Sequence, residues 1–147
     1  MASSARDARP ADAGVCAVIT ATGRDADDFI AAFDSDLEAW VVLESDAGEV
    51  IGVGGCQIWR WNRLGWVMDL TVRRDRRGHG QGRLLLEALV EAAKAKGALV
   101  LMDFEPQGGP LIEFYIQNGF RICGFNDRYL PTNEDPSVVF LSRDLTG

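Results

Sequence analysis

The most constraining feature of the sequence is an apolar run that leads into a loop rich in glycine and arginine, followed by a long amphipathic segment. Residues Trp66–Val72 are short and mostly apolar, and they predict a strand. Apolar positions in Gln81–Lys96 recur at helical spacing, and Gly97 follows directly, which predicts a helix that ends there. The loop Arg73–Arg83 between them contains five arginines and three glycines. The sequence therefore predicts a strand–loop–helix unit in which the loop lies at the start of the helix.

Further strands and two short helices are predicted on either side of this unit. Short apolar runs bounded by turn residues predict strands at Val15–Thr20, Ala39–Glu44, Glu49–Trp59, Ala98–Phe104, Phe120–Phe125 and Ser137–Asp144. The predicted helices run from Asp25 or Asp27 to Phe33, and from Pro110 to Gln117. Strands come first and then alternate with helices, which predicts the α/β (α+β) class with a mixed sheet and helices on its faces.

The length of 147 residues fits one domain. We expect residues 14–147 to form it. Residues 1–13 contain Ala, Ser, Arg and Asp without an apolar stretch, so we expect them to be disordered. This segment also lacks the apolar centre of a secretory signal, and no apolar run reaches the roughly 18 residues that a membrane span needs. The prediction is a cytoplasmic protein without membrane contacts.

Net charge and cysteine spacing limit which ligands, nucleic acids and metal ions the protein is expected to bind. Fifteen Lys and Arg residues against 22 Asp and Glu residues give a formal net charge of −7, the wrong sign for a protein that binds nucleic acid through its phosphates. An acidic surface attracts cationic ligands, but it also serves solubility alone, and net charge does not distinguish the two. Cys16, Cys56 and Cys123 lie far apart without the paired spacing of a zinc site, so we predict buried, reduced thiols and no metal site.

The glycine- and arginine-rich loop has the chemistry of a phosphate site. Backbone N–H groups at a helix start are unpaired and carry partial positive charge, and nearby glycines let a ligand approach closely. The spacing Gly-x-Gly-x-Gly differs from the dinucleotide fingerprint, and no Lys-Ser or Lys-Thr follows as a P-loop requires. The alternative, a plain strand-to-helix turn, does not account for five arginines.

Two motifs in order resemble one family. Arg77-x-x-Gly80-x-Gly82, preceded by a strand ending at Val72, is similar to the acetyl-CoA motif of GNAT acetyltransferases. The later segment Phe114–Phe120 resembles the "FY..NGF" segment of the same family. The resemblance extends from about Ala39 to Leu145, and it implies the GNAT fold: a mixed, mostly antiparallel sheet with a central parallel pair.

The resemblance also implies acetyl-CoA as cofactor and a set of residues that hold it. The backbone of Leu70, Thr71 and Val72 would pair with the pantetheine arm. The pyrophosphate would lie on the loop, whose implied cofactor-binding residues are Arg77, Gly78, His79, Gly80, Gln81, Gly82 and Arg83.

Acetyl transfer to an amine needs a neutral amine, a polarised thioester and a proton for the departing thiolate. Tyr115 matches the family tyrosine that protonates the sulfur of coenzyme A, and an aromatic residue that only packs in the core is the alternative. Asp69 is predicted as base and acceptor ligand, with a local hydrogen bond at a turn or bulge as the alternative. Asp103 and Glu105 are further predicted acceptor-binding residues. His79 is the single histidine and lies in the loop, which excludes a Ser-His-Asp or Cys-His mechanism.

A narrower resemblance concerns streptothricin acetyltransferases, which N-acetylate a cationic antibiotic. It rests on Trp61-Asn62-Arg63, the strand with Asp69, the Glu105-x-Gln107 pair and Ile122–Leu130. The prediction is transfer of acetyl to a primary amine of a small cationic molecule. A protein or peptide acetyltransferase and an inactive acetyl-CoA-binding regulatory module are the alternatives. Little chain lies between Thr20 and Ala39 to wall the acceptor site, which would then be open or completed by a second subunit in a homodimer.

Overall fold

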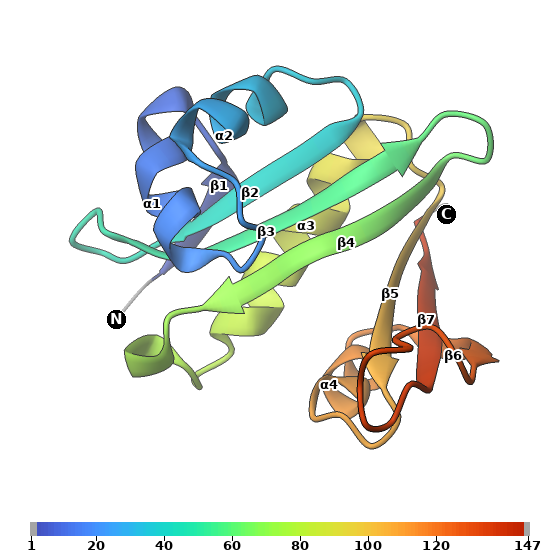
Figure 1. The fold of residues 1–147 in the computed structure, drawn as a ribbon. Helices are drawn as coiled ribbons and strands as arrows, with labels where there is room; N and C mark the ends of the chain where they lie inside the picture. Colours follow the sequence, from blue (N-terminus) through green and yellow to red (C-terminus); the bar gives the residue numbers. More distant parts are fainter. Residues whose placement is uncertain (1–2, 146–147) are drawn as a thin grey trace.

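Seven strands in one sheet form the centre of the computed structural model, which describes residues 3–145 (Figure 1). The strands are β1 Ser4–Asp7, β2 Glu38–Glu44, β3 Val50–Trp59, β4 Leu64–Val72, β5 Val100–Pro106, β6 Arg121–Asn126 and β7 Val138–Asp144. Their order across the sheet is β1-β2-β3-β4-β5-β7-β6, and each pair is antiparallel except β4 with β5. This confirms the predicted mixed sheet with a central parallel pair.

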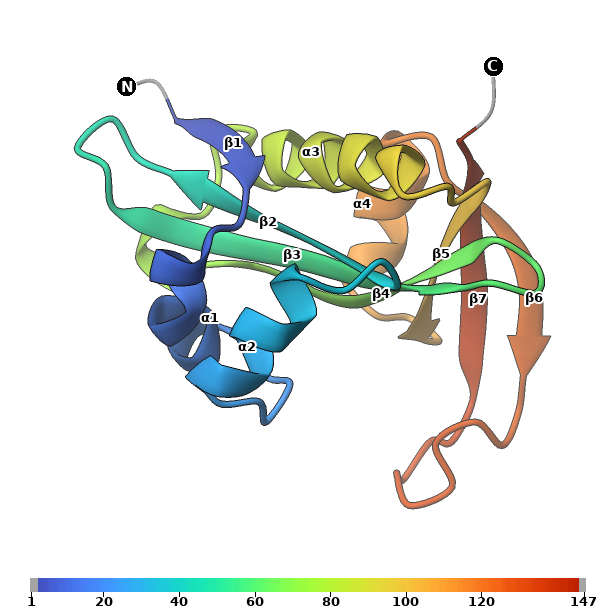
Figure 2. The ribbon, with the colours of Figure 1, turned by 90° about the horizontal axis from the view of Figure 1, so that it is seen from above.

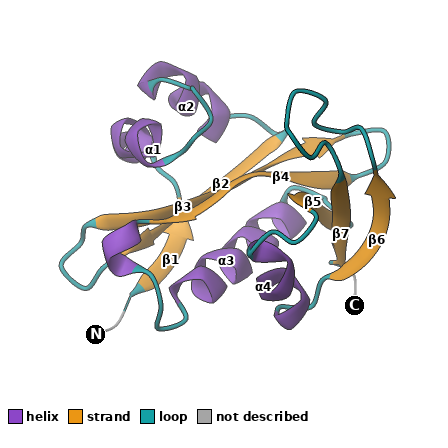
Figure 3. Cartoon of the chain, turned by 60° about the horizontal axis from the view of Figure 1, so that its bottom comes forward, coloured by secondary structure: helices purple, strands orange, loops and turns teal. Residues whose placement is uncertain are grey.

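Helices cover both faces of the sheet, as Figures 2 and 3 show. They are α1 Ala13–Ile19, α2 Ala26–Phe33, α3 Gln81–Ala95 and α4 Leu111–Gln117. The apolar stripe of α3, including Leu85, Leu86 and Leu89, is fully buried against one face, and α4 adds Tyr115 to the same core cluster. On the opposite face, α1 and α2 bury Cys16 and Phe29 in a second cluster over β2 and β3.

The prediction of a disordered segment 1–13 is wrong for the residues that the structure describes. Strand β1 pairs with β2, and a short 3-10 helix follows it at Pro10–Asp12. The Arg6 guanidinium explains this order, because it donates to Asp12 Oδ2 at 2.8 Å and to Glu44 Oε2 at 2.6 Å. Composition could not show this pairing, since β1 is an edge strand whose residues are mostly small or charged. Residues 1 and 2 lie outside the described residues.

The predicted strand Val15–Thr20 is helix α1 instead. A short apolar run fits either structure, and tertiary packing decides between them. In α1 the buried residues Ala13 and Cys16 are three apart on one helical face, and Thr20 Oγ1 donates to Cys16 O at the helix end. The helix predicted from Asp25 or Asp27 is α2, capped by Asp25, whose side chain accepts from Asp28 N.

The elements predicted from Ala39 onward are confirmed to within two residues at each end. Cys16 and Cys56 are buried free thiols as expected, whereas Cys123 is exposed on the edge strand β6. None of the helices in residues 3–145 has the length and apolar character needed to cross a membrane.

The parallel strands β4 and β5 pair over a short stretch and then separate, and this separation shapes the candidate active site. The two strands pair only from Leu64–Trp66 to Val100–Met102, and then diverge (Figure 1). The β3–β4 ladder also shifts register, so that Gly55 pairs with Asp69 and Cys56 with Val67. Met68 is the extra residue of this bulge. Beyond it the side chains change faces: Leu70 packs against the α3 cluster and Asp69 lies on the opposite face.

A close approach between Gly55 and Trp40 gives a stability test. A Cβ added at Gly55 would lie 2.2 Å from Trp40 Cε3, because the indole ring lies over this glycine in the β2–β3 pair. We expect Gly55→Ala to lower the free energy of unfolding by about 1–3 kcal/mol, the usual cost of overpacking. In urea denaturation the matched variant Gly14→Ala, with open space around its new Cβ in α1, should gain about 0.5–1 kcal/mol. Equal stability of the two variants would contradict the proposed packing.

Candidate active site

A cavity of about 720 Å³ lies between the end of β4, the start of α3 and α4. Its volume falls within the roughly 300–1,000 Å³ typical of ligand sites. Every residue predicted to hold acetyl-CoA lines this cavity except His79, which is exposed. The lining residues from this group are Leu70, Thr71, Val72, Arg77, Gly78, Gly80, Gln81, Gly82 and Arg83.

The loop backbone has the conformation that a bound phosphate needs. Gly78, His79 and Gly80 have φ values of 92°, 57° and 74°, a left-handed run that favours glycine. Gly80 is the N-cap of α3 and supplies no side chain, so no side-chain cap occupies the first-turn amides of the helix. A Cβ added at Gly78 or Gly80 would meet no atom within 4 Å, which leaves open space beside the loop backbone. This arrangement fits an anionic group.

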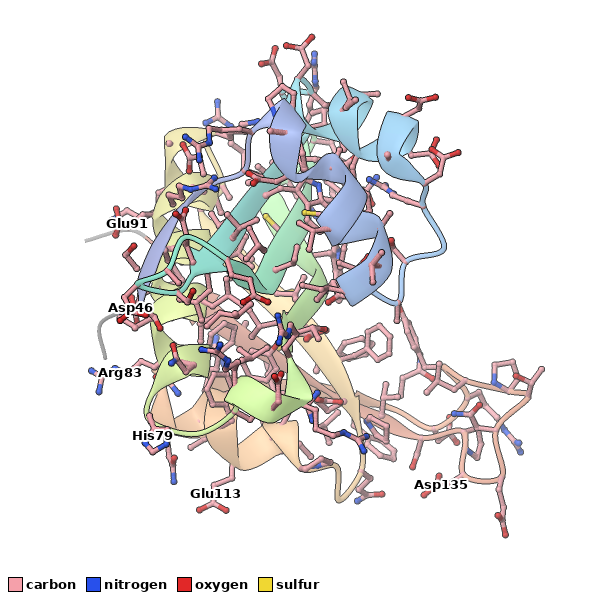
Figure 4. All side chains as sticks on the ribbon, turned by 90° about the vertical axis from the view of Figure 1, so that its left-hand side faces the viewer. Asp46, His79, Arg83, Glu91, Glu113 and Asp135 are labelled. Carbon is pink, nitrogen blue, oxygen red and sulfur yellow. The ribbon has the colours of Figure 1, made fainter. Side chains whose placement is uncertain are left out.

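The five arginines of the loop have different environments. Arg73 is paired with Asp75 at 2.8 Å and with Glu49, so its charge is already balanced. Arg77 donates from Nε to Val72 O at 2.9 Å, which fixes it beside the cavity. Within residues 3–145, Arg77 and Arg83 form no ion pair. Figure 4 shows Arg83 and His79 extending outward from the start of α3.

The buried Tyr115 and the half-buried Asp103 form a pair at the point where β4 and β5 separate. Tyr115 is fully buried, and its hydroxyl donates to Asp103 Oδ2 at 2.5 Å. Asp103 directly follows Met102, the last β5 residue that pairs with β4. Tyr115 itself does not line the cavity, but the neighbouring Phe114 does, with its ring centroid 5.7 Å from that of Tyr115. The tyrosine thus lies directly behind the cavity wall.

Burial shifts the titration of this pair. It raises the pKa of Asp103 to about 7, although the hydrogen bonds from the Tyr115 hydroxyl and the Phe104 amide lower it. Burial also raises the pKa of Tyr115 above its usual range, with the Asp103 carboxylate adding to the effect. The charges of Glu105 and Asp69 raise both pKa values further, so the four groups share one electrostatic environment. Burial alone raises the pKa of Glu105.

Asp69 lies apart from the Tyr115–Asp103 pair, on the opposite face of the sheet. Its Oδ2 accepts from Ala21 N at 3.0 Å, and its Oδ1 accepts from Thr71 Oγ1 at 2.5 Å. The local hydrogen bond considered from the sequence is therefore present, beside the bulge at Met68. The carboxylate is half-buried, and Ala21 belongs to the connection between α1 and α2.

Sequence reasoning missed the wall of the cavity formed by α4. This wall consists of Pro110, Leu111, Phe114, Gln117 and Asn118. The second motif contains Phe114 and Asn118, so its aromatic and amide residues could have indicated a ligand wall. Among residues 3–145 no three His, Cys, Asp or Glu side chains are placed to hold a metal ion.

Comparisons with known proteins agree with this geometry. The family model described as "Acetyltransferase (GNAT) family" matches residues 10–120. Streptothricin acetyltransferase from Streptomyces lavendulae is 29% identical over 105 residues, which cover 71% of this chain and 55% of that protein. The chain thus spans about half the length of this curated relative.

Solved structures show the same fold. Nourseothricin acetyltransferase superposes with a TM-score of 0.75 at 22% identity, over 99% of this chain and 100% of that one. A GNAT superfamily phosphinothricin acetyltransferase from Sinorhizobium meliloti, solved in complex with acetyl-CoA, gives 0.76 at 19% identity, over 98% and 89%. The match to the family model spans most of the chain and includes the loop, the β4–β5 split and Tyr115. The chain therefore belongs to the acetyltransferase (GNAT) family, whose cosubstrate is acetyl-CoA.

Proposed function

We propose that this protein transfers the acetyl group of acetyl-CoA to a primary amine of a small cationic molecule, with a streptothricin-like antibiotic as the first acceptor to test. The observation that carries the proposal is the cavity between the end of β4, the start of α3 and α4, with the Tyr115–Asp103 pair behind its wall and Asp69 on the opposite face of the sheet. Acetyl-CoA would supply an activated acetyl thioester. The side chains on either side of the split would transfer two protons, one to the departing sulfur and one from the acceptor ammonium.

The loop and β4 would hold the cosubstrate. Arg77, Arg83 and the free amides at the start of α3 suit the pyrophosphate. Beyond Trp66, the backbone of β4 has no strand partner on the β5 side among residues 3–145. The peptide groups of Leu70–Val72 line the cavity there, and they can pair with the amides of an extended pantetheine arm.

The proposed general acid and general base lie on opposite faces of the sheet. Tyr115 Oη holds a proton at the level of the split and would donate it to the departing sulfur. Asp69 would orient the acceptor ammonium and take up its proton, since the cavity for the anionic cosubstrate lies on the other face. Both assignments are part of the proposal.

Charge supports a cationic acceptor. Asp103 and Glu105 on β5 and Asp69 on the opposite face of the sheet are near enough for their charges to affect one another, in a chain of net charge −7. Half-buried carboxylates favour an ammonium ligand, and a second cation on the acceptor would lower the pKa of the reacting amine. The similarity to streptothricin acetyltransferase points to the same class.

The first test concerns the loop. We expect Arg77→Ala and Arg83→Ala each to weaken acetyl-CoA binding about tenfold, the effect of losing a charge-assisted hydrogen bond of roughly 1.5 kcal/mol. Isothermal titration calorimetry would measure the dissociation constants. Arg121→Ala, an exposed arginine on β6 outside the cavity, is the matched control and should bind as the wild type does. Unchanged affinity in both loop variants would exclude this cavity as the phosphate site.

The second test concerns Tyr115. Tyr115→Phe should lower kcat by about 10²-fold, the usual contribution of a general acid, and leave acetyl-CoA affinity nearly intact. Pre-steady-state thiol release would establish that chemistry limits the rate.

The dependence of kcat on pH tests the same role of Tyr115, with Asp103→Asn as the matched variant. At a pH above about 7 the charged Asp103 accepts a hydrogen bond from the Tyr115 hydroxyl. Below that pH the neutral carboxyl can donate a hydrogen bond to Tyr115 Oη, so that the phenolic O–H is available to another acceptor. With Tyr115 as the acid, kcat should decline above pH 7 in the wild type. Asp103→Asn, which keeps an acceptor but does not titrate, should lose this decline. If Tyr115→Phe keeps the wild-type kcat, Tyr115 is not the general acid and serves only in packing.

The third test concerns the acceptor. Purified protein would be screened with acetyl-CoA and a panel of amines for free thiol release, together with growth of a susceptible bacterium on streptothricin. For a cationic acceptor, kcat/KM should fall with rising salt. Asp69→Asn should lower kcat/KM for the cationic acceptor about tenfold or more. It should lower kcat/KM less for an aromatic amine that is neutral at pH 7. Absence of protection, together with faster acetylation of peptide N-termini or lysines, would favour the protein acetyltransferase; binding without turnover would favour the regulatory module.

A further inference from the structure

Five aromatic rings form a continuous chain across the sheet, which we call the aromatic wall. It consists of Trp59, Trp66, Phe140, Tyr129 and Phe104, in that order. The successive ring centroids are 5.8, 5.9, 5.3 and 4.8 Å apart, within the range of favourable aromatic contacts. The buried Trp66 Nε1 has no hydrogen-bond partner among the described residues, so ring packing alone fixes this indole.

The aromatic wall lies on the face that carries α1 and α2. On β7 the neighbours of Phe140, Val139 and Leu141, point into the α3 cluster, so Phe140 points to the other face. The same alternation applies to Trp66 on β4 and to Phe104 on β5, whose neighbours Val67 and Asp103 face α3 and α4. This is also the face of Asp69, three residues after Trp66 on the same strand.

Part of this face is accessible. On this face, helices α1 and α2 lie over β2 and β3 and extend only to Met68 and Asp69 of β4 (Figures 2 and 3). No described helix covers β5 and β7 here. The connection 127–137 between β6 and β7 projects on the same side as α1 and α2 and contributes Tyr129 (Figure 2). The exposed fractions of Trp59 and Tyr129 are 39% and 40%, so both rings present area to a ligand.

The electrostatics of this face favour a cation. The one cation–ring contact within residues 3–145 is that of Arg24 with Trp40, so no arginine or lysine of the described chain occupies the aromatic wall. Acidic residues predominate toward its Tyr129 end, where the connection 127–137 carries Asp127, Glu134 and Asp135 against Arg128 alone, and Asp69 lies on β4. The Trp59 end instead shares a hollow with Arg60, Arg63 and Lys96, so a cation is favoured at the Tyr129 end. Figure 4 shows Asp135 at the outer part of this connection.

We propose that the aromatic wall binds a second, non-reacting cationic group of the acceptor, while the reacting amine lies at Asp69. A ring face attracts a cation through its quadrupole, and the attraction strengthens where water is partly excluded. The wall extends from Trp66, close to Asp69, to Tyr129 on the connection. It therefore selects acceptors with two separated positive charges over monoamines. This inference rests on the proposed acetyl transfer and names its specificity site.

The test compares two acceptors of similar length, 1,6-diaminohexane and 6-amino-1-hexanol, which share the reacting amine and differ in the charge of the far end. Titration calorimetry of each into the complex with coenzyme A gives affinity without turnover, and thiol release with acetyl-CoA gives kcat/KM. We expect the wild type to prefer the diamine by about tenfold. Tyr129→Leu should lose about three- to tenfold for the diamine, as expected for one partly exposed cation–ring contact, and change less than twofold for the amino alcohol.

Two control variants separate the role of the ring from a structural role. Tyr129→Phe keeps the ring and should keep the preference. Phe125→Leu removes an exposed ring on β6 outside the aromatic wall and should leave both amines unaffected. Equal losses for both amines in Tyr129→Leu, or a diamine preference that survives it, would overturn the proposal, and so would a wild type that binds the two amines equally or binds neither. Failure of coenzyme A itself to bind, measured first, would instead contradict the proposed function.

Discussion

The separation of β4 from β5 beyond Trp66 and Met102 is the constraint on which the site depends. In a continuous sheet these strands would satisfy each other's peptide groups and leave no access between the two faces. Because they diverge, β4 retains unpaired backbone groups that a ligand arm can use as a replacement strand. The bulge at Met68 contributes to this, since bulges increase local twist. The same bulge turns Asp69 to the face away from α3, so one opening has chemically different groups on its two sides.

The Tyr115–Asp103 pair shows the cost of placing polar groups at such an opening. A buried phenol and a half-buried carboxylate each lose hydration, and their mutual hydrogen bond compensates only in part. The remaining cost appears as the raised pKa of Asp103, near 7. A fully apolar pair at this position would pack without that penalty. The retained polarity at the level of the split is therefore better explained by proton handling than by stability.

Local sequence signals predicted the elements that depend on local chemistry and failed where distant contacts decide. The period of Gln81–Lys96 and the turn residues around it were sufficient for α3 and the loop. By contrast, β1 depends on the Arg6 contacts with Asp12 and Glu44, and α1 on packing over β3. The loop that lines the cavity could be predicted because its residues are contiguous. The aromatic wall could not, since its rings come from β3, β4, β5, β7 and a connection.

The distribution of charge explains how an acidic chain can take an anionic cosubstrate. Arg73 is neutralised by Glu49 and Asp75, whereas Arg77 and Arg83 remain unpaired among the described residues beside the cavity. Charges more than about 10 Å apart are largely screened at 0.1 M salt, so these two arginines and the amides of α3 dominate the potential at the loop. Across the sheet, Asp69 and the acidic residues of the connection 127–137 supply negative charge. Opposite potentials at the two ends of one opening would bring an anion and a cation to the same point from different sides, and the net charge of −7 describes neither end.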